Sequence, residues 1–329
     1  MIITQTPLRV GLFGGGTDFK EFYLKEEGAV LSFGIDKYVY VIVKERFDEK
    51  IYINYSKKEI VNHVDDIAHD LVREAMRKTG ITGGVEVTTL ADVPSKGSGL
   101  GSSSSITVGL LNAFYTYQGE QVPQERLAME ACEIEIDIVG KPIGVQDQYI
   151  AAYGNMRFFE FQRNGQVNVE KLDLTDEQKR MLVSNLLLFF TNKTRSSSEV
   201  LTEQRKNISE RMDELRRLRD IAYEARRIIL SGRTDETGHL LHESWQEKKK
   251  LASNVSTKDI DVMYERAREA GATGGKIAGA GSGGFLLLYC PRENQNAVRE
   301  ALKEYREMPF LLSRDGSKVI FNMRGYAWK

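Results

Sequence analysis

The 329-residue sequence is poor in cysteine, and its positive and negative charges nearly cancel. Its two cysteines, Cys132 and Cys290, form neither a CxxC pair nor a zinc-ligand pattern, which argues against a disulfide framework and a zinc site. The formal net charge of −1 gives no support for nucleic-acid or membrane binding through bulk electrostatics. No apolar run approaches the ~20 residues of a membrane helix, and no signal peptide is evident. A cytoplasmic location is therefore expected.

What the sequence contains is the composition of a folded protein, with 41% hydrophobic and 28% charged residues. Strand-like and helix-like segments are interspersed along a chain long enough for two domains. Strands are expected at 2–13, 29–32, 37–44, 50–55, 84–91, 155–170 (a pair), 182–190, 273–278, 284–290, 308–313 and 318–323. Helices are expected at 66–79, 102–117, 124–138, 146–152, 208–228, 234–250, 257–270 and 294–304. This pattern predicts an α+β protein with an N-terminal domain over 1–178 and a C-terminal domain over 179–329.

The most informative segment is residues 94–105, in which three glycines at alternate positions precede four serines and an apolar, helix-like run. Glycine lets the backbone approach a ligand closely, and backbone N–H groups converge at the positive end of a helix dipole. The segment therefore indicates a phosphate site. It is not a Walker A loop, because no Gly-Lys-Ser/Thr follows the glycines. A Gly/Ser linker is the alternative, although a strand-like run and an amphipathic helix flank the segment.

A second glycine cluster, Gly14 to Gly16, ends the first strand-like run and precedes Thr17 and Asp18. Three successive glycines free the backbone for a ligand, and the Asp18 carboxylate can accept hydrogen bonds from hydroxyl groups. Arg9 supplies a permanent cation on the same strand. A glycine turn with an Asx cap is an equally good interpretation of these residues.

A third cluster, in residues 274–285, contains Gly279, Gly281 and Gly284 in the spacing of the dinucleotide fingerprint GxGxxG. That fingerprint must open a helix, whereas a strand-like run follows these glycines. We therefore expect a glycine turn between two strands, packed against a neighbouring site.

The fourth segment, residues 131–148, carries several carboxylates. Acidic residues on a helix usually form a solvated face, and this is the interpretation for Glu133. Asp147 differs because apolar residues bound its short polar neighbourhood, so partial burial is expected. A buried carboxylate needs a partner, and Arg9 is the obvious candidate.

These four segments, in this order, resemble those of the GHMP small-molecule kinases, which include galactokinase, homoserine kinase, mevalonate kinase and phosphomevalonate kinase. The resemblance runs from Pro7 to Phe285, most of the chain. It implies a two-domain α+β fold, with an N-terminal domain like the second domain of ribosomal protein S5 and a ferredoxin-like C-terminal domain. It also implies ATP, with its phosphates on the loop at 97–105.

Details of the sequence point to one branch of this family. Residues 14–18 read Gly-Gly-Gly-Thr-Asp, which departs from the Gly-Glu-His-Thr-Asp of galactokinases. Together with residues 35–39, 191–197 and 241–249, they resemble the D-glycero-D-manno-heptose 7-phosphate kinases. Fucokinase-type enzymes share parts of this pattern.

The resemblance implies a role for particular residues. Asp147 would accept or orient the proton of the acceptor hydroxyl, and Arg9 would offset negative charge on the transferring phosphoryl group. Glu135 and Ser103 would hold Mg²⁺. The implied ATP-binding residues are Pro94, Lys96, Gly97, Ser98, Gly99, Leu100, Gly101, Ser102, Ser103 and Ser104. The implied substrate-binding residues are Gly15, Gly16, Thr17, Asp18, Gly279 and Gly281, with Lys193 and Arg195.

The implied reaction is ATP-dependent phosphorylation of the anomeric hydroxyl of D-glycero-D-manno-heptose 7-phosphate to the 1,7-bisphosphate. A phosphorylated substrate needs a second anion site, which Lys193 and Arg195 would supply unless they form an ordinary solvated loop. The alternatives are a neutral sugar kinase of fucokinase or galactokinase type, and a non-catalytic sugar or ATP sensor on the same fold. Expected partners are small molecules, with a homodimer left open.

Overall fold

The computed structural model describes residues 1–94, 97–194 and 197–323. The strands of its larger sheet are β1 (Ile2–Phe13), β2 (Gly28–Glu45), β3 (Ile51–Asn54), β4 (Lys58–Val61), β5 (Val85–Ala91), β6 (Met156–Phe161), β7 (Val167–Lys171) and β11 (Lys318–Asn322). Those of the smaller sheet are β8 (Leu186–Phe190), β9 (Gly274–Ile277) and β10 (Phe285–Tyr289). The helices are α1 (Lys20–Glu26), α2 (Asp70–Thr79), α3 (Ser102–Gln118), α4 (Gln124–Cys132), α5 (Gln146–Tyr153), α6 (Asp176–Ser184), α7 (Ser197–Asn207), α8 (Met212–Leu230), α9 (Thr237–Lys249), α10 (Lys258–Glu269) and α11 (Gln295–Ala301).

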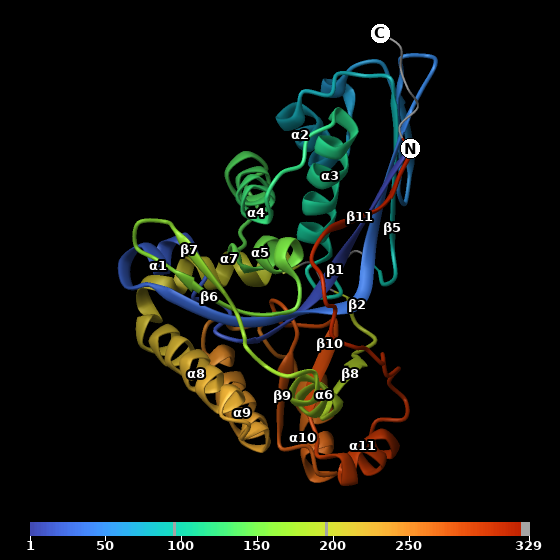
Figure 1. Cartoon of the computed structure of the whole chain (residues 1–329). Coiled ribbons are helices and arrows are strands. Elements are labelled where there is room, and N and C mark those ends of the chain that lie inside the picture. The colour runs from blue at the N-terminus through green and yellow to red at the C-terminus, as the bar shows by residue number, and fades with distance from the viewer. Residues whose placement is uncertain (95–96, 195–196, 324–329) are drawn as a thin grey trace.

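Two layers meet along the long strands β1 and β2. Helices α2 to α5 lie on one side of these strands and, with the large sheet, form the first layer. Helices α8 and α9 and the small sheet lie on the other side and form the second layer (Figure 1). The large sheet has the order β11-β1-β2-β5-β3-β4, with β6 and β7 joined to β2, and the small sheet has the order β8-β10-β9. Loops from both layers can therefore meet beside β1.

Strand β2 is the spine of the large sheet, because three strands pair with it. It runs antiparallel to β1 over most of its length, while β6 pairs with its first part and β5 with its last. Val39, Val41 and Val43 are buried in alternation with more exposed neighbours, as expected for a strand with one face on the core. The sequence predicted separate strands at 29–32 and 37–44, which are one strand in the structure.

Helix α3 is buried on nearly all sides and packs against β1 and β2. Its apolar residues follow no single stripe, which suits a helix inside the core rather than on the surface. Gly101, at its N-cap, is left-handed, and Gly119 ends the helix in the same conformation. This packing fixes the N-terminus of α3 beside the middle of β1, where Arg9 lies.

The structure corrects three sequence expectations. Residues 182–190 are not one strand, because α6 continues to Ser184 before β8 begins. The helix predicted at 124–138 is α4 followed by a π-helical segment, Glu133–Ile138. Residues 308–313 form no strand and make a single isolated bridge, between Leu312 and Ile35.

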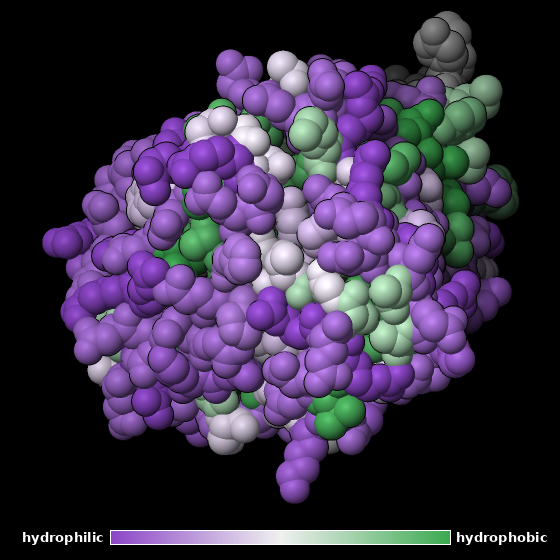
Figure 2. All heavy atoms as spheres, turned by 90° about the horizontal axis from the view of Figure 1, so that it is seen from below, coloured by the Kyte–Doolittle hydropathy of each residue, from purple (hydrophilic) through white to green (hydrophobic). Residues whose placement is uncertain are grey.

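The last described strand returns to the first layer, where β11 pairs antiparallel with β1. The proposed division of the chain at residues 178 and 179 stays a prediction. Among the described residues, no helix is both long and apolar enough to cross a membrane. Seen from below, the side of the second layer is predominantly hydrophilic, with small scattered hydrophobic areas (Figure 2).

Candidate active site

The loop between β5 and α3 presents a helix N-terminus framed by glycines. Gly97, Gly99 and Gly101 have φ values of 72, 72 and 76°, in the left-handed region that favours glycine. The Oγ atoms of Ser98 and Ser102 lie 3.2 Å apart and share a hydrogen bond. The first N–H groups of a helix lack partners within it, and the helix dipole favours an anion there. The loop thus has the backbone geometry of a phosphate site.

The C-terminal glycine turn packs directly against this loop. It lies between β9 and β10, so the prediction of a glycine turn between two strands is confirmed. A Cβ on Gly99 would stand 2.3 Å from the carbonyl oxygen of Ala278, and a Cβ on Gly284 would stand 2.5 Å from that of Ser98. The two loops therefore touch backbone to backbone, which joins the second layer to the phosphate-type loop.

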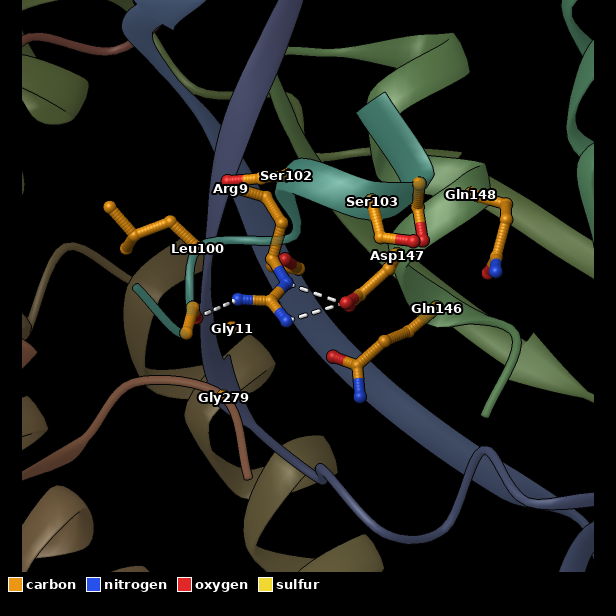
Figure 3. Close-up of polar contacts among 12 residues, drawn as sticks. Arg9, Gly11, Leu100, Ser102, Ser103, Gln146, Asp147, Gln148 and Gly279 are labelled. Atoms are coloured by element: carbon orange, nitrogen blue, oxygen red, sulfur yellow. Dashed lines mark hydrogen bonds and ion pairs between the residues drawn. The ribbon is translucent and has the colours of Figure 1, made fainter. Parts of the chain in front are cut away.

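Arg9 and Asp147 form a bidentate ion pair at this junction. Arg9 Nε donates to Asp147 Oδ1 at 2.7 Å, and Nη2 donates to Oδ2 at 2.6 Å. Arg9 Nη1 donates to the carbonyl oxygen of Gly99 at 2.5 Å, and the Arg9 backbone N–H donates to Leu100. Figure 3 shows the two charged side chains pointing toward each other, with Gln146 beside them. The predicted partnership of Arg9 and Asp147 is confirmed.

The two partners differ in exposure, and the difference matters for access. The Arg9 side chain is 7% exposed, whereas that of Asp147 is 22% exposed. The guanidinium is thus fixed in the protein, while the carboxylate remains open to an incoming group. Asp147 comes from the first turn of α5, which packs against α3 and β1.

Glu135 lies in a buried polar cluster beside the start of α3. Its carboxylate is fully buried and accepts hydrogen bonds from Ser103 Oγ and, at 2.7 Å each, from Ser104 Oγ and Gln148 Nε2. Lys141 Nζ lies 2.9 Å from Glu135 Oε1 and 2.5 Å from Ser103 Oγ. The two residues that the resemblance assigned to Mg²⁺ are therefore in contact, with an ammonium cation beside them.

Asp18 is a second carboxylate close to Asp147, and backbone groups hold it. It is 2% exposed and accepts hydrogen bonds from the N–H groups of Gly16, at 3.0 Å, and Gln146, at 3.3 Å. Burial raises the pKa of Asp18, and the charge of Asp147 raises it further. A Cβ on Gly144 would lie 2.0 Å from Asp18 Oδ2, so only glycine allows the backbone at position 144 to pack against this carboxylate.

A recess opens between these groups. Arg9, Asp18 and Asp147 line it from the first layer, and Lys248 and Lys276 line it from the second. Gly15, Gly16 and Gly279 contribute backbone to its walls.

Other residues predicted from the sequence fall outside this lining. Thr17 is buried, and its Oγ1 donates to the carbonyl oxygens of Gly14 at 2.8 Å and Ala29 at 3.0 Å, so it fixes the glycine turn. Gly281 packs against the backbone of Val255. Lys193 forms an ion pair with Asp259.

Lys96 and Arg195 lie outside the described residues. Pro94, which was assigned to ATP, is exposed at the end of the described part of its loop.

Sequence reasoning missed four residues of the site: Lys141, Gln148, Lys248 and Lys276. Lys248 opens a run of three lysines at the end of α9, which is typical of a solvated helix end. Lys276 stands in the third glycine segment and follows two glycines, and a charged residue within an otherwise apolar strand was the available signal. Burial of the two second-layer lysines became evident only from the fold.

Comparison with known proteins identifies the family of this chain. The model of the GHMP kinases N terminal domain matches residues 62–155, and that of the GHMP kinases C terminal region matches residues 221–307. The D-glycero-alpha-D-manno-heptose 7-phosphate kinase of Campylobacter jejuni is 30% identical, over 96% of this chain and 98% of its own length. The chain belongs to the GHMP kinases. It is therefore a kinase, and the family implies ATP as its phosphoryl donor.

Solved structures extend the likeness to the whole fold. A D-glycero-D-manno-heptose 1-phosphate kinase from Bacteroides thetaiotaomicron has a TM-score of 0.83 and 26% identity, covering 99% of this chain and all of its own. Lactococcus lactis galactokinase has a TM-score of 0.76 at 19% identity, covering 96% of this chain and 94% of its own, and shares the fold. The expected two-domain GHMP kinase fold and the resemblance to the heptose 7-phosphate kinase branch are confirmed.

Proposed function

We propose that this protein transfers the γ-phosphoryl group of ATP to the anomeric hydroxyl of D-glycero-D-manno-heptose 7-phosphate, giving the 1,7-bisphosphate. The Campylobacter jejuni relative supports a heptose 7-phosphate as the acceptor. The single observation that carries the proposal is the bidentate Arg9–Asp147 pair, which faces the recess beside the phosphate-type loop.

Asp147 is the group that receives or orients the proton of the acceptor hydroxyl. Its carboxylate is the more exposed half of the ion pair and lines the recess. General acid–base catalysis requires such a group within hydrogen-bond reach of the reacting hydroxyl. The two hydrogen bonds from Arg9 hold the Asp147 carboxylate in one orientation beside the recess.

Arg9 offsets negative charge on the transferring phosphoryl group. A guanidinium has five N–H groups, and three of them already donate to Asp147 and Gly99. The remaining two are free to meet a phosphoryl oxygen. Because its backbone is fixed to Leu100 and its side chain is nearly buried, the cation needs little rearrangement when the reaction begins.

The chemistry of the Glu135 cluster fits a magnesium ion. Mg²⁺ prefers hard oxygen ligands, and the buried Glu135 carboxylate and the half-buried Ser103 hydroxyl supply them beside the Lys141 cation. Bound there with ATP, the ion would neutralise charge on the phosphates. Glu135 and Ser103 would hold it, and Gln148 and Ser104 would orient the carboxylate.

The Asp18 carboxylate is suited to accept hydrogen bonds from hydroxyl groups of the sugar. Backbone N–H groups fix its carboxylate in the wall of the recess, which Gly15 and Gly16 also line. A carboxylate in such a position orients an acceptor through hydrogen bonds, and orientation supplies much of the rate of phosphoryl transfer.

An ADP-release assay with Mg²⁺ and a panel of acceptors tests this function. The panel contains D-glycero-D-manno-heptose 7-phosphate, the corresponding 1-phosphate, unphosphorylated heptose, galactose and fucose. We expect turnover of the 7-phosphate and a new phosphorus NMR signal coupled to the anomeric proton. The 1-phosphate is included because the Bacteroides protein bears that name.

The other outcomes would overturn the proposal in different ways. Preference for galactose or fucose would indicate a neutral sugar kinase. Turnover of the 1-phosphate alone would move the reaction to another hydroxyl. Binding of ATP without turnover of any sugar would indicate a sensor.

A further inference from the structure

Two lysines of the second layer line the recess, and neither forms an ion pair with a carboxylate among the described residues. Lys248, near the end of α9, is 5% exposed, and Lys276, on β9, is 4% exposed. Lysine is almost never buried to this extent unless it is paired. Here Lys248 Nζ donates to the carbonyl oxygen of Gly279, and Lys276 Nζ donates to those of Gly11, at 2.9 Å, and Leu12, at 3.0 Å. These acceptors are neutral.

Both ammonium groups have N–H donors that make no hydrogen bond within the described residues. Each carries three N–H groups, of which Lys248 uses one and Lys276 uses two. The remaining donors belong to two cations that line the same recess. A buried donor without a partner is costly, so the recess favours a ligand with several acceptor oxygens.

The charged residues that line the recess favour the binding of an anion. Its ionisable lining consists of Arg9, Lys248, Lys276, Asp18 and Asp147. Arg9 and Asp147 form an ion pair, and Asp18, which backbone N–H groups hold, offsets the charge of the two lysines only in part. Burial lowers the pKa of Lys248 to about 8, and burial, together with the charges of Lys248 and Arg9, holds the pKa of Lys276 well below its usual range. The two ammonium groups are therefore poorly compensated until an anion arrives.

We propose that Lys248 and Lys276 bind the phosphate group that the sugar substrate already carries. This inference rests on the function proposed above, and it names the residues that select a phosphorylated acceptor over a neutral one. It also departs from the sequence expectation that Lys193 and Arg195 form this site. The Lys193 ammonium is already paired with Asp259 and lies outside the recess lining, which the described residues define.

A phosphoryl group could reach these lysines from either of two sources, the sugar phosphate or ATP. The sugar source is favoured because the N-terminus of α3 and the glycine loop provide a separate phosphate site for the nucleotide. The lysines instead share the recess with Asp18 and the backbone of Gly15 and Gly16. The two sources predict different kinetic effects.

Lys248→Met is the informative variant, because it removes the charge and keeps a similar length. Lys276 has two structural acceptors on β1, so its replacement would also disturb that strand. Lys250→Met is the matched control, since Lys250 is exposed, two residues away, and paired only with Glu247. Lys193→Met tests the competing site.

The first measurement compares kcat/KM for heptose 7-phosphate and unphosphorylated heptose. Loss of a charged hydrogen bond to a phosphate should lower the value for the phosphorylated sugar about 10- to 100-fold in Lys248→Met. The value for the neutral sugar and the KM for ATP should change little. A similar loss of kcat with both acceptors would assign the lysine to the phosphoryl group of ATP and would overturn the proposal.

The second measurement does not depend on turnover. Inorganic phosphate is titrated by calorimetry into each protein while a nonhydrolysable ATP analogue fills the nucleotide site. We expect Lys248→Met to weaken phosphate binding by about tenfold or more and Lys250→Met and Lys193→Met to leave it unchanged. Unchanged binding in Lys248→Met, or weakened binding in Lys193→Met alone, would overturn the proposal. If heptose 7-phosphate is not a substrate, this titration still decides the role of the lysines.

Discussion

The two layers each line part of one recess, and they differ in how the charges of their side chains are compensated. The first-layer wall holds Arg9, Asp18 and Asp147, whose charges are met by one another or by backbone N–H groups. The second-layer wall holds Lys248 and Lys276, whose ammonium groups meet only carbonyl oxygens. The first-layer wall is thus preorganised in the protein alone, as catalysis requires. The second-layer wall is completed by its ligand, as selective binding requires.

The largest effect is expected at the ion pair of the first-layer wall. Asp147→Asn should lower kcat by about 100-fold or more, the scale of losing a general base. Binding of a nonhydrolysable ATP analogue, measured by calorimetry, should remain nearly intact. Asp137→Asn is the control, because Asp137 is exposed and paired with Lys20. Normal turnover by Asp147→Asn would place the base elsewhere.

A smaller effect is expected where the two layers touch. Gly99→Ala would place a Cβ 2.3 Å from the Ala278 carbonyl oxygen, whereas a Cβ on Gly165 meets nothing within 4 Å. Both glycines are left-handed, so each substitution should cost about 1–2 kcal/mol of folding free energy from backbone strain.

Only Gly99→Ala should also displace the phosphate-type loop. We expect kcat/KM for ATP to fall about tenfold or more in that variant, because small displacements are costly in an oriented site. Steady-state kinetics together with thermal unfolding separates the two effects. Equal activity in Gly99→Ala and Gly165→Ala would show that the contact between the layers does not position ATP.

The metal dependence offers a further contrast within the first layer. Glu135→Gln should raise the Mg²⁺ concentration for half-maximal activity by about tenfold, since a neutral amide binds the cation less well. Binding of Mn²⁺ to the complex with a nonhydrolysable ATP analogue, followed by electron paramagnetic resonance, should weaken in parallel. Glu133→Gln is the control, because Glu133 is on the same segment but is paired with Lys78 at the surface. Equal metal dependence in the two variants would remove Glu135 from the metal site.

The smallest expected effect is a pH dependence confined to the second-layer wall. Lys248 loses its proton as the pH rises through about 8, so its cation is present below that value and absent above it. A sugar phosphate stays a dianion throughout, because its second pKa is about 6. kcat/KM for heptose 7-phosphate should therefore fall by up to about tenfold between pH 7 and pH 9.

Lys248→Met provides the check on this pH profile. The decline above pH 8 should disappear for the phosphorylated sugar in that variant, and a neutral acceptor should show no such decline in the unmodified protein. An identical alkaline decline in both proteins would mean that another group titrates.

The phosphate-type loop and the ion pair of the first-layer wall could be predicted from the types of residue in the sequence. Alternating glycines before a helix encode the loop at 97–101, and the partnership of Arg9 and Asp147 follows from a carboxylate that needs a cation. The first inference rests on a local pattern, whereas the second rests on the need of a buried carboxylate for a cation, although the two residues are far apart in the chain. The roles of these residues, in contrast, came from the resemblance to a family.

The second-layer wall could not be predicted, because burial of a lysine is set by the fold. The run Lys248 to Lys250 gives no sign that its first member is buried while its last is exposed. The helix α6 was missed for a related reason, since an apolar run suits either a buried strand or the core face of a helix. The capping box of Thr175 and Gln178 was the local signal that a helix begins there.

The pairing of β11 with β1 has a practical consequence for protein engineering. It brings residues 318–322 alongside residues 2–5, so both ends of the described chain lie at one sheet edge. Closely spaced ends tolerate circular permutation. A permuted chain with new ends in the exposed turn around Gly165 would retain the pairing of β11 with β1. Expressing residues 1–178 alone would instead strip β11 from β1 and leave a bare edge prone to self-association.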